Sequence, residues 1–383
     1  MIGRPRVAFI LAALGAGGAE RVIAEVSERF VLDGADVSVI AFDRPDEPTF
    51  HRFHPRVRLI RLGLPSRDGR FAAPARALGR AVRLRQILQD GRFDVAISFL
   101  TKINALTLLA TFGLRLSVIV SERNNPLRQP HHLLWKTAVN LLYRRARAIV
   151  IQTERARMCL PHRERARAIV IGNPVSAPKA TPRGEELAQC VGVGRLDRQK
   201  GFDLLIDAFA RTAPDFPDWE LVIWGEGPER PALERRIAAL GLKSQATLAG
   251  NSPSPGSWAE TATMLVLSSR FEGSPNVVAE SMAAGIPVIA ADCDFGPAEL
   301  IDDGHNGLLV QPEDASALAD AMARMMSDPG LRKRLGQAGQ RSMRKRARSD
   351  QIMAQWRDVV LGAIDNEGPA TDIRTGLAAS TSL

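Results

Sequence analysis

Short apolar segments alternate with helical segments along nearly the whole chain, and this alternation limits the fold more than any other feature. In the second half of the chain, between residues 190 and 310, these segments are apolar on both sides of their alternation, which is typical of strands covered on both faces. Strands that alternate with helices form parallel sheets, because a parallel pair needs a long crossover connection. The sequence therefore predicts an α/β fold.

The predicted strands form two series, separated by the proline-rich segment Asn173–Ala188. In the first series we expect strands at Val7–Leu14, Val37–Phe42, Val57–Leu62, Val95–Phe99, Val118–Ser121, Ile149–Gln152 and Ile169–Ile171. In the second we expect strands at Cys190–Val193, Leu221–Trp224, Ala246–Leu248, Met264–Leu267, Val288–Ala290 and Gly307–Val310. Each series predicts one doubly wound, Rossmann-like domain. Because such sheets bind ligands at the carboxyl ends of their strands, we expect the two domains to face each other across a cleft.

The domain boundaries follow from these two series. We predict a first domain over residues 1–175 and a second over residues 189–345, which contains a helix at Ala315–Met326. An amphipathic helix is expected at Ser349–Ile364, and we assign it to the first domain. Residues 365–383 are rich in Gly, Thr, Ser and Ala, which predicts a disordered tail.

Charge is distributed unevenly between the two halves of the chain. The 51 Lys and Arg exceed the 42 Asp and Glu, which gives a net charge of +9. Residues 1–180 carry a net charge of +16, and residues 181–383 carry −7. A basic half indicates an anionic partner. Nucleic acid is disfavoured, because this half has neither aromatic residues interleaved with its cations nor a known binding module.

Two basic segments of the first half are candidates for contact with an anionic membrane surface. One is residues 70–92, where Arg76, Arg80 and Arg83 share a helical stripe, and the other is Pro130–Arg147. Basic helices with apolar neighbours suit an interfacial position. A merely solvated basic face is the alternative, since 44 of the 51 cations are Arg.

The cysteine, histidine and hydropathy patterns exclude several classes of protein. Cys159, Cys190 and Cys293 have no CxxC spacing, so we expect free buried thiols in a reducing compartment. The six histidines have no metal-ligand spacing. No apolar run reaches the roughly 18 residues that span a membrane, and Val7–Leu14 is interpreted as a strand, not a signal peptide. We expect a cytoplasmic protein, peripheral on the inner face of the membrane.

A glycine-rich turn, Gly15–Glu20, follows the first predicted strand and precedes a helix. Gly17 and Gly18 can let backbone amides approach an anion at the N-terminus of that helix. The turn does not match the dinucleotide-binding motif, because Glu20 stands where the last glycine is required. A turn needed only for packing is the alternative.

Two motifs of the second series indicate a diphosphate-containing ligand. Arg195 and Lys200 follow a strand, and a guanidinium fork with an ammonium group complements a diphosphate. Glu272 and Glu280 flank the start of a predicted helix that begins at Pro275, is capped by Ser274 and ends at Gly285. The amides at the N-terminus of this helix can hold phosphate or sugar oxygens.

Together these motifs resemble those of the retaining glycosyltransferases of family four, which have the GT-B fold. Arg195 with Lys200, Glu272 with Glu280, the turn Gly225-Glu226-Gly227-Pro228, and Gly17-Gly18 carry the resemblance, which covers residues 7 to about 325. It implies two Rossmann-like domains, a nucleotide-diphosphate sugar donor held by the second domain, with UDP favoured, and a lipid-linked saccharide acceptor held by the first. It also implies no cofactor and no metal, so Asp292-Cys293-Asp294 is interpreted as a loop and not as a metal-binding DxD motif.

The resemblance also assigns roles to residues. It implies that Arg195 and Lys200 hold the donor diphosphate and that Glu272 binds hydroxyls of the donor sugar, which makes these the catalytic residues. Glu280 would bind the ribose. The other donor-binding residues that it implies are Gly17, Gly18, Gly225, Glu226, Gly227, Gly250, Gly273, Ser274 and Asn276. Retention would follow from a front-face mechanism, in which the leaving phosphate helps to deprotonate the acceptor hydroxyl.

One loop departs from the family pattern. Many members have a histidine after a central strand of the first domain, where this chain reads Ser121-Glu122-Arg123-Asn124-Asn125-Pro126. That loop resembles the variant in enzymes that add hexose or N-acetylhexosamine to polyprenyl-diphosphate oligosaccharides. We therefore predict that Arg123 and Asn124 contact the sugar or the acceptor diphosphate. The alternatives are a nucleotide-sugar 2-epimerase of the same fold, against which Arg195 and Lys200 argue, and a non-catalytic scaffold, against which the complete set of motifs argues.

Overall fold

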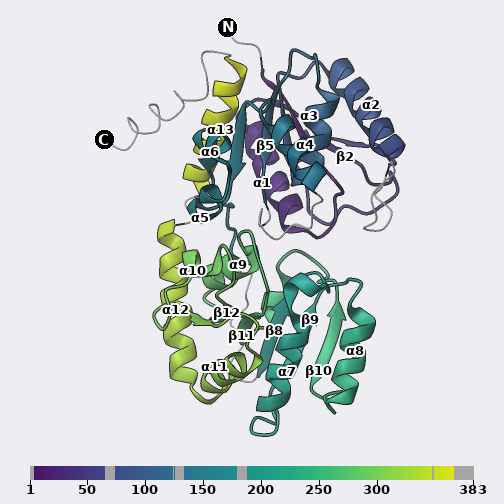
Figure 1. The fold of residues 1–383 in the computed structure, drawn as a ribbon. Coiled ribbons are helices and arrows are strands. Elements are labelled where there is room, and N and C mark those ends of the chain that lie inside the picture. Colours follow the sequence, from purple (N-terminus) through teal and green to yellow (C-terminus); the bar gives the residue numbers. More distant parts are fainter. Residues whose placement is uncertain are drawn as a thin grey trace. The chain divides into compact units, whose positions relative to one another are not determined.

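The computed structural model describes residues 4–64, 74–123, 125, 133–178, 188–346 and 349–365 (Figure 1). The chain divides into two compact units. Unit 1 comprises Met1–Pro174 and Ser349–Leu383, and unit 2 comprises Val175–Arg348. Residues 179–187 of the expected linker and residues 366–383 of the expected disordered tail lie outside the described residues.

Unit 1 contains a seven-stranded sheet in the order β3-β2-β1-β4-β5-β6-β7, in which every neighbouring pair is parallel. Its strands are β1 (Arg6–Leu11), β2 (Asp36–Ala41), β3 (Arg58–Arg61), β4 (Val95–Phe99), β5 (Ser117–Ser121), β6 (Ala148–Ile151) and β7 (Ala168–Val170). Its helices are α1 (Gly18–Leu32), α2 (Pro74–Gly91), α3 (Thr101–Ala110), α4 (Leu133–Tyr143), α5 (Glu154–Met158), α6 (His162–Ala166) and α13 (Ser349–Ile364). The chain order reverses between β1 and β4, and doubly wound sheets bind ligands at this point.

Unit 2 contains a six-stranded parallel sheet in the order β10-β9-β8-β11-β12-β13. Its strands are β8 (Gln189–Val193), β9 (Glu220–Trp224), β10 (Ala246–Gly250), β11 (Met264–Leu267), β12 (Val288–Ala291) and β13 (Leu308–Val310). Its helices are α7 (Phe202–Thr212), α8 (Arg230–Ala239), α9 (Asn276–Ala284), α10 (Pro297–Leu300), α11 (Ala315–Ser327) and α12 (Pro329–Arg346), with 3-10 turns η1 (Arg198–Lys200) and η2 (Ser257–Glu260). Here the order reverses between β8 and β11.

The structure confirms the predicted α/β architecture, and a strand lies at every predicted position in the described residues. The helix predicted at Ser349–Ile364 is also confirmed. β1 ends at Leu11, three residues earlier than predicted, because the chain turns there into the glycine-rich loop. β3 exposes Arg58 and Leu59, because it lies at the sheet edge.

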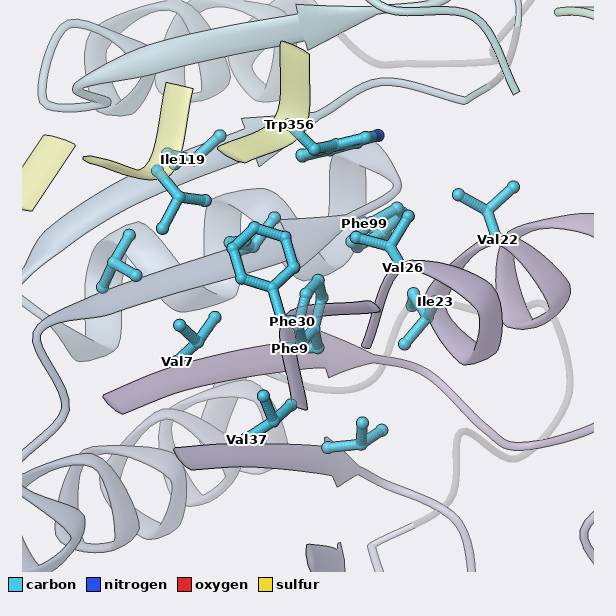
Figure 2. Close-up of a cluster of buried hydrophobic side chains, with 14 of the residues drawn as sticks. Val7, Phe9, Val22, Ile23, Val26, Phe30, Val37, Phe99, Ile119 and Trp356 are labelled. Atoms are coloured by element: carbon cyan, nitrogen blue, oxygen red, sulfur yellow. The ribbon is translucent and has the colours of Figure 1, made fainter. Parts of the chain in front are cut away.

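The core of unit 1 joins the start of the chain to its last helix (Figure 2). Phe9 of β1 packs edge-on against Phe30 of α1 with ring centroids 6.0 Å apart, and Trp356 of α13 stacks on Phe99 at 6.0 Å. Trp356 is fully buried. Because burying such a large ring contributes a few kcal/mol, roughly 3–5 by analogy with truncation to alanine, α13 is an integral part of unit 1.

In unit 2, two helices approach each other closely enough to fix the end of α9. Gly336 of α12 faces the C-cap of α9, and a Cβ on it would lie only 2.2 Å from the Gly285 carbonyl oxygen. Gly285 has a φ of 79°, so it ends α9 as predicted. The position of α9 is therefore set by direct backbone packing against α12.

Candidate active site

The loop after β8 packs directly against the loop after β11, where the sheet order reverses. The Asp197 carboxylate caps the turn η1 by accepting from the Lys200 amide at 3.3 Å. Gly201 follows with a φ of 64°, and a Cβ on it would lie 2.2 Å from the Ser268 carbonyl oxygen. Only glycine fits this position, so the two loops are held in register by their backbones.

Lys200 and Glu272, both predicted site residues, are in direct contact. Lys200 Nζ lies 2.8 Å from Glu272 Oε1, and Ser269 Oγ donates to the same oxygen at 2.6 Å. Glu272 is buried, whereas Lys200 remains partly exposed. Both bonds end on Oε1, so Glu272 Oε2 and the other ammonium protons of Lys200 are the groups that can bind a ligand.

Arg195 lies at the start of the same loop and is mostly exposed. Its side chain is 70% exposed, and its Nε and Nη2 lie 2.6 and 2.5 Å from Asp197 Oδ2. Asp197 therefore competes with any anionic ligand for this guanidinium. Arg195 was predicted at the site, but nothing in the sequence pattern indicated Asp197 as its carboxylate partner.

Glycines at the carboxyl ends of β8, β9 and β10 bring three backbone segments together. Gly225 has a φ of 143°, and a Cβ on it would lie 1.8 Å from the Gly194 carbonyl oxygen. A Cβ on Gly227 would lie 2.3 Å from the Leu196 carbonyl oxygen. The Gly225 amide also donates to the Gly250 carbonyl at 2.7 Å. These glycines therefore have a packing role, in addition to any role in binding a nucleotide.

Two other carboxylates of the predicted donor site differ in exposure. Glu226 is exposed, and its oxygens accept from Arg230 Nη2 at 2.9 Å and Nε at 3.0 Å. Glu280 is buried within α9. The structure therefore gives unit 2 two buried acidic side chains at the predicted site, Glu272 and Glu280.

The start of α9 differs from the prediction by one residue. Asn276 is the first helical residue and Pro275 is the N-cap, and no side chain among the described residues caps the helix. The prediction that Ser274 caps it is therefore wrong. Packing fixes this start instead, because a Cβ on Gly296 would lie 2.4 Å from Pro275 Cδ and 3.0 Å from Ser274 Cα.

In unit 1, the glycine-rich loop after β1 is braced by the segment that follows β2. Gly17 is the N-cap of α1, and His51 Nε2 lies 3.2 Å from its carbonyl oxygen. The Leu14 amide donates to Asp43 Oδ2 at 2.8 Å. Burial of His51, with a smaller contribution from the Arg21 charge, lowers its pKa to about 4. His51 is therefore neutral at pH 7, and its Nε2–H donates to Gly17.

A buried polar network supports the predicted acceptor loop after β5. Glu122 is buried and accepts from Thr101 Oγ1 at 2.9 Å, from Asn104 Nδ2 at 3.0 Å and from the Tyr143 hydroxyl. Burial raises the pKa of Glu122, and these hydrogen bonds oppose the rise. Sequence reasoning missed this network, although Glu122 directly precedes Arg123 at the end of a buried strand.

Arg123 is held between aromatic rings and polar side chains. Its guanidinium lies 5.2 Å from the Phe99 ring centroid and 5.4 Å from that of Trp356, and it donates to Ser121 Oγ at 2.8 Å and Asn173 Oδ1 at 2.5 Å. Burial lowers the pKa of Arg123 to about 9. Its Nη2 is buried with no hydrogen-bond partner among the described residues. Asn124, predicted beside it, lies outside those residues.

The predicted basic stripe of α2 is only partly exposed. Arg76 and Arg83 are exposed, but Arg80 donates to the Leu64 carbonyl at 2.6 Å and lies 5.8 Å from the Phe42 ring centroid. Arg80 is therefore less available to an external surface than Arg76 and Arg83. The second basic segment is described from residue 133 on, and its side chains from residue 137 on.

The three cysteines differ in burial. Cys190 and Cys293 are buried, but Cys159 is partly exposed, so the prediction of three buried thiols is wrong for Cys159. Within the described ranges, no group of three or more His, Cys, Asp or Glu side chains is arranged to hold a metal ion. No helix in the same ranges is long and apolar enough to cross a membrane.

Two family models match the two units, the first over most of the N-terminal segment of unit 1 and the second over nearly all of unit 2. Residues 17–174 match the glycosyl transferase 4-like domain, and residues 177–342 match the glycosyl transferases group 1. The chain belongs to the group 1 and 4-like glycosyltransferases. The resemblance inferred from the motifs is thereby confirmed, and so is the GT-B fold.

This glycosyltransferase is also similar to individual proteins of two kinds, a phosphotransferase over part of its length and a sugar transferase over most of it. It is 34% identical to an exopolysaccharide phosphotransferase of Streptomyces coelicolor over 219 residues, 55% of this chain and 23% of that protein. It is 27% identical over 334 residues, 86% of this chain, to a Campylobacter jejuni α-1,4-N-acetyl-D-galactosaminyltransferase whose name includes a diphospho-undecaprenol-linked saccharide, and the match covers 91% of that enzyme. The solved structure of Anabaena Alr3699/HepE with UDP and glucose matches 94% of this chain and 100% of its own, with a TM-score of 0.76 and 18% identity.

Proposed function

We propose that this glycosyltransferase moves a hexose or N-acetylhexosamine, with retention of anomeric configuration, from a nucleotide-diphosphate sugar to a lipid-linked saccharide in polysaccharide or glycan assembly. The observation that carries the proposal is the Lys200–Glu272 contact of 2.8 Å at the point where the unit 2 sheet order reverses. A cation beside a buried carboxylate there can bind a sugar diphosphate at both of its ends.

The proposed chemistry is electrostatic. As the bond to the anomeric carbon breaks, negative charge grows on the leaving diphosphate, and Lys200 and Arg195 stabilise it. Glu272 Oε2 accepts from a hydroxyl of the donor sugar, and Glu280 from the ribose. The amides near Gly273 and α9 offer further donors to phosphate or sugar oxygens. The departing phosphate then takes the proton of the acceptor hydroxyl on the same face, which retains the configuration.

The nature of the donor and acceptor rests on the relatives. The Campylobacter jejuni relative is named for transfer of N-acetylgalactosamine to a diphospho-undecaprenol saccharide, and the Anabaena structure contains UDP and glucose. We therefore favour a UDP-sugar donor and an acceptor with a lipid-linked diphosphate. In unit 1, Arg123 is suited to such an acceptor, because its guanidinium is a cation whose Nη2 has no hydrogen-bond partner among the described residues.

A donor panel tests this function. Purified protein is incubated with UDP-, GDP- and ADP-sugars and an undecaprenyl-diphosphate oligosaccharide, with and without EDTA, and product stereochemistry is read by NMR. We expect transfer from a UDP-sugar with retention, insensitivity to EDTA, and losses of at least 100-fold in Lys200→Ala and Glu272→Ala, each still folded. Near-normal transfer in either variant would contradict the assigned roles. Epimerised nucleotide sugar, transferred phosphosugar, or no turnover with any donor would contradict the transferase proposal.

We also propose that unit 1 meets an anionic membrane surface through α2 and its neighbours. α3 packs between α2 and α4, and these helices, with the turn that follows α3, expose large apolar side chains: Leu78, Val82, Leu109, Phe112 and Leu141. Exposed cations such as Arg76 and Arg83 lie beside them on α2. Apolar side chains ringed by cations are typical of helices that lie in the membrane interface.

Liposome binding tests the membrane contact. Each cation near an anionic surface contributes about 1 kcal/mol, so Arg76→Gln with Arg83→Gln should weaken binding to phosphatidylglycerol vesicles about 30-fold. The matched control removes two exposed cations of unit 2, Lys333→Gln with Arg334→Gln on α12. If the two double variants weaken vesicle binding equally, α2 is only a solvated basic face and the proposed membrane contact is wrong.

A further inference from the structure

Arg270, in the loop after β11, connects three loops of unit 2. Its Nη1 and Nη2 donate to the two carboxylate oxygens of Asp203 at 2.8 and 2.7 Å, and its Nε donates to Glu313 Oε1 at 2.9 Å. Asp203 lies in the first turn of α7, after the loop that carries Lys200, and Glu313 follows β13. The two terminal nitrogens of the guanidinium thus bind the Asp203 carboxylate, and Nε binds the Glu313 carboxylate.

Backbone hydrogen bonds around Arg270 join the Lys200 loop to the Glu272 loop. The Arg270 amide donates to the Gln199 carbonyl at 2.8 Å, and Arg270 Nη1 donates to the Arg198 carbonyl at 3.0 Å. In the opposite direction, Gln199 Nε2 donates a hydrogen bond to the Phe271 carbonyl at 3.0 Å. The carbonyls immediately before Lys200 and Glu272 are therefore bound within one network.

Arg270 and Asp203 each stabilise the charged form of the other. The Arg270 side chain is 16% exposed. The hydrogen bonds with Asp203 raise the pKa of Arg270, despite its burial. Burial raises the pKa of Asp203, but the bonds and charge of Arg270 outweigh it and lower that pKa overall. Glu313 has a φ of 60°, which is uncommon for a residue with a side chain. Its carboxylate forms an ion pair with Arg270.

We propose that Arg270 is a positioning residue for sugar transfer: it holds Lys200 and Glu272 at the 2.8 Å separation needed to bind the donor. This inference rests on the proposed function. Arg270 does not need to touch the donor, because its guanidinium is already engaged by two carboxylates and a carbonyl. Lysine cannot replace it, since an ammonium group lacks the planar fork that spans Asp203 and Glu313 together.

A matched ion pair in the same unit provides the control. Arg236 of α8 also donates through Nε and Nη2 to both carboxylate oxygens of one aspartate, Asp207 of α7, with the Nε bond at 2.6 Å. Neither residue takes part in the contacts between the Lys200 and Glu272 loops. Removing either guanidinium therefore deletes a bidentate ion pair with an aspartate. Of the two arginines, only Arg270 connects the Lys200 and Glu272 loops.

The experiment compares Arg270→Gln, Arg270→Lys and Arg236→Gln with the wild type. The readouts are the melting temperature, the Kd for UDP by calorimetry, and kcat and KM with the UDP-sugar that the wild type turns over. We expect a larger loss of melting temperature in Arg270→Gln than in Arg236→Gln, because the Arg270 side chain is 16% exposed and the Arg236 side chain 44%, so activity is compared at a temperature at which all variants are folded. Since misplacing reacting groups by about 1 Å can cost 100-fold in rate, kcat/KM should fall about 10- to 100-fold in both Arg270 variants, mainly through kcat, and less than 2-fold in Arg236→Gln.

The outcomes separate this inference from the function on which it rests. Equal kcat/KM in Arg270→Gln and Arg236→Gln, or full rescue by Arg270→Lys, would overturn the positioning role, even where Lys200→Ala and Glu272→Ala are inactive. A wild type that neither binds UDP nor turns over a UDP-sugar would overturn the proposed donor and this inference together. Asp203→Asn offers a second route, because it removes the carboxylate and leaves Arg270 in place, and it should reproduce the Arg270→Gln phenotype.

Discussion

Replacing Gly225 by alanine should damage both the stability and the donor site of unit 2. The added Cβ would lie 1.8 Å from the Gly194 carbonyl oxygen and must move to at least 3.0 Å, a shift of 1.2 Å between the ends of β8 and β9. Overpacking of this kind costs about 1–3 kcal/mol. The φ of 143° adds about 1–2 kcal/mol for a residue with a side chain. The expected loss in the free energy of unfolding is about 3 kcal/mol.

Gly241→Ala separates the two causes. Gly241 also has a positive φ, 72°, but a Cβ on it would meet no heavy atom within 4 Å. This variant should therefore lose only about 1 kcal/mol. Urea unfolding followed by circular dichroism measures both losses, and UDP calorimetry measures the site. Gly225→Ala should also bind UDP at least 10-fold more weakly, because the shift displaces the residue before Arg195.

The reasoning fails if the two variants unfold within about 0.5 kcal/mol of each other. That result would mean that the close approach of Gly225 and Gly194 relaxes without cost. Normal UDP binding by a strongly destabilised Gly225→Ala would instead show that the backbone after β8 does not position the donor site.

Two further predictions concern single titratable groups. His51 has a folded pKa of about 4 against 6.5 for the free side chain, so acid favours the unfolded chain, and lowering the pH from 7 to 5 should cost the wild type about 2 kcal/mol more than His51→Gln in urea unfolding. Equal pH dependence in the two proteins would contradict a buried neutral His51. Among the thiols, Cys159 should react rapidly with Ellman's reagent and Cys190 and Cys293 only after unfolding, since burial raises the pKa of Cys293 to about 12. Rapid labelling of all three would show that unit 2 opens readily.

The sequence predicted the fold better than it predicted the contacts within the site. Strand positions follow from local runs of apolar residues, and each run has its strand. The contact between Lys200 and Glu272 joins residues 72 positions apart and depends on β8 pairing with β11. A glycine-rich loop or a pair of carboxylates signals a ligand, but sheet order decides which loops become neighbours.

Residues that act through other residues left little signal in the sequence. Arg270 has no local feature that distinguishes it from a solvated arginine, because Asp203 and Glu313 reach it only in the folded sheet. Glu122 is similar, since its donors come from α3 and α4, and a buried glutamate is uncommon enough that an exposed one is the default expectation. Such residues become visible only when the elements that surround them are assembled.

The charge asymmetry between the halves has a partly internal explanation. Arg85 donates to the Ala110 carbonyl at 3.0 Å at the end of α3, and Arg167 donates to the Tyr143 carbonyl at 2.9 Å at the end of α4. Arg147 donates to the Gly362 carbonyl at 3.1 Å near the end of α13. Carbonyls at helix C-termini carry partial negative charge, so arginines can satisfy them without any carboxylate partner. Each such arginine raises the net charge of the half without adding a cation for an external ligand, and the count of +16 therefore overstates the positive surface available to a membrane. Cations that remain exposed without such a bond, such as Arg76, are the ones that a membrane contact must use.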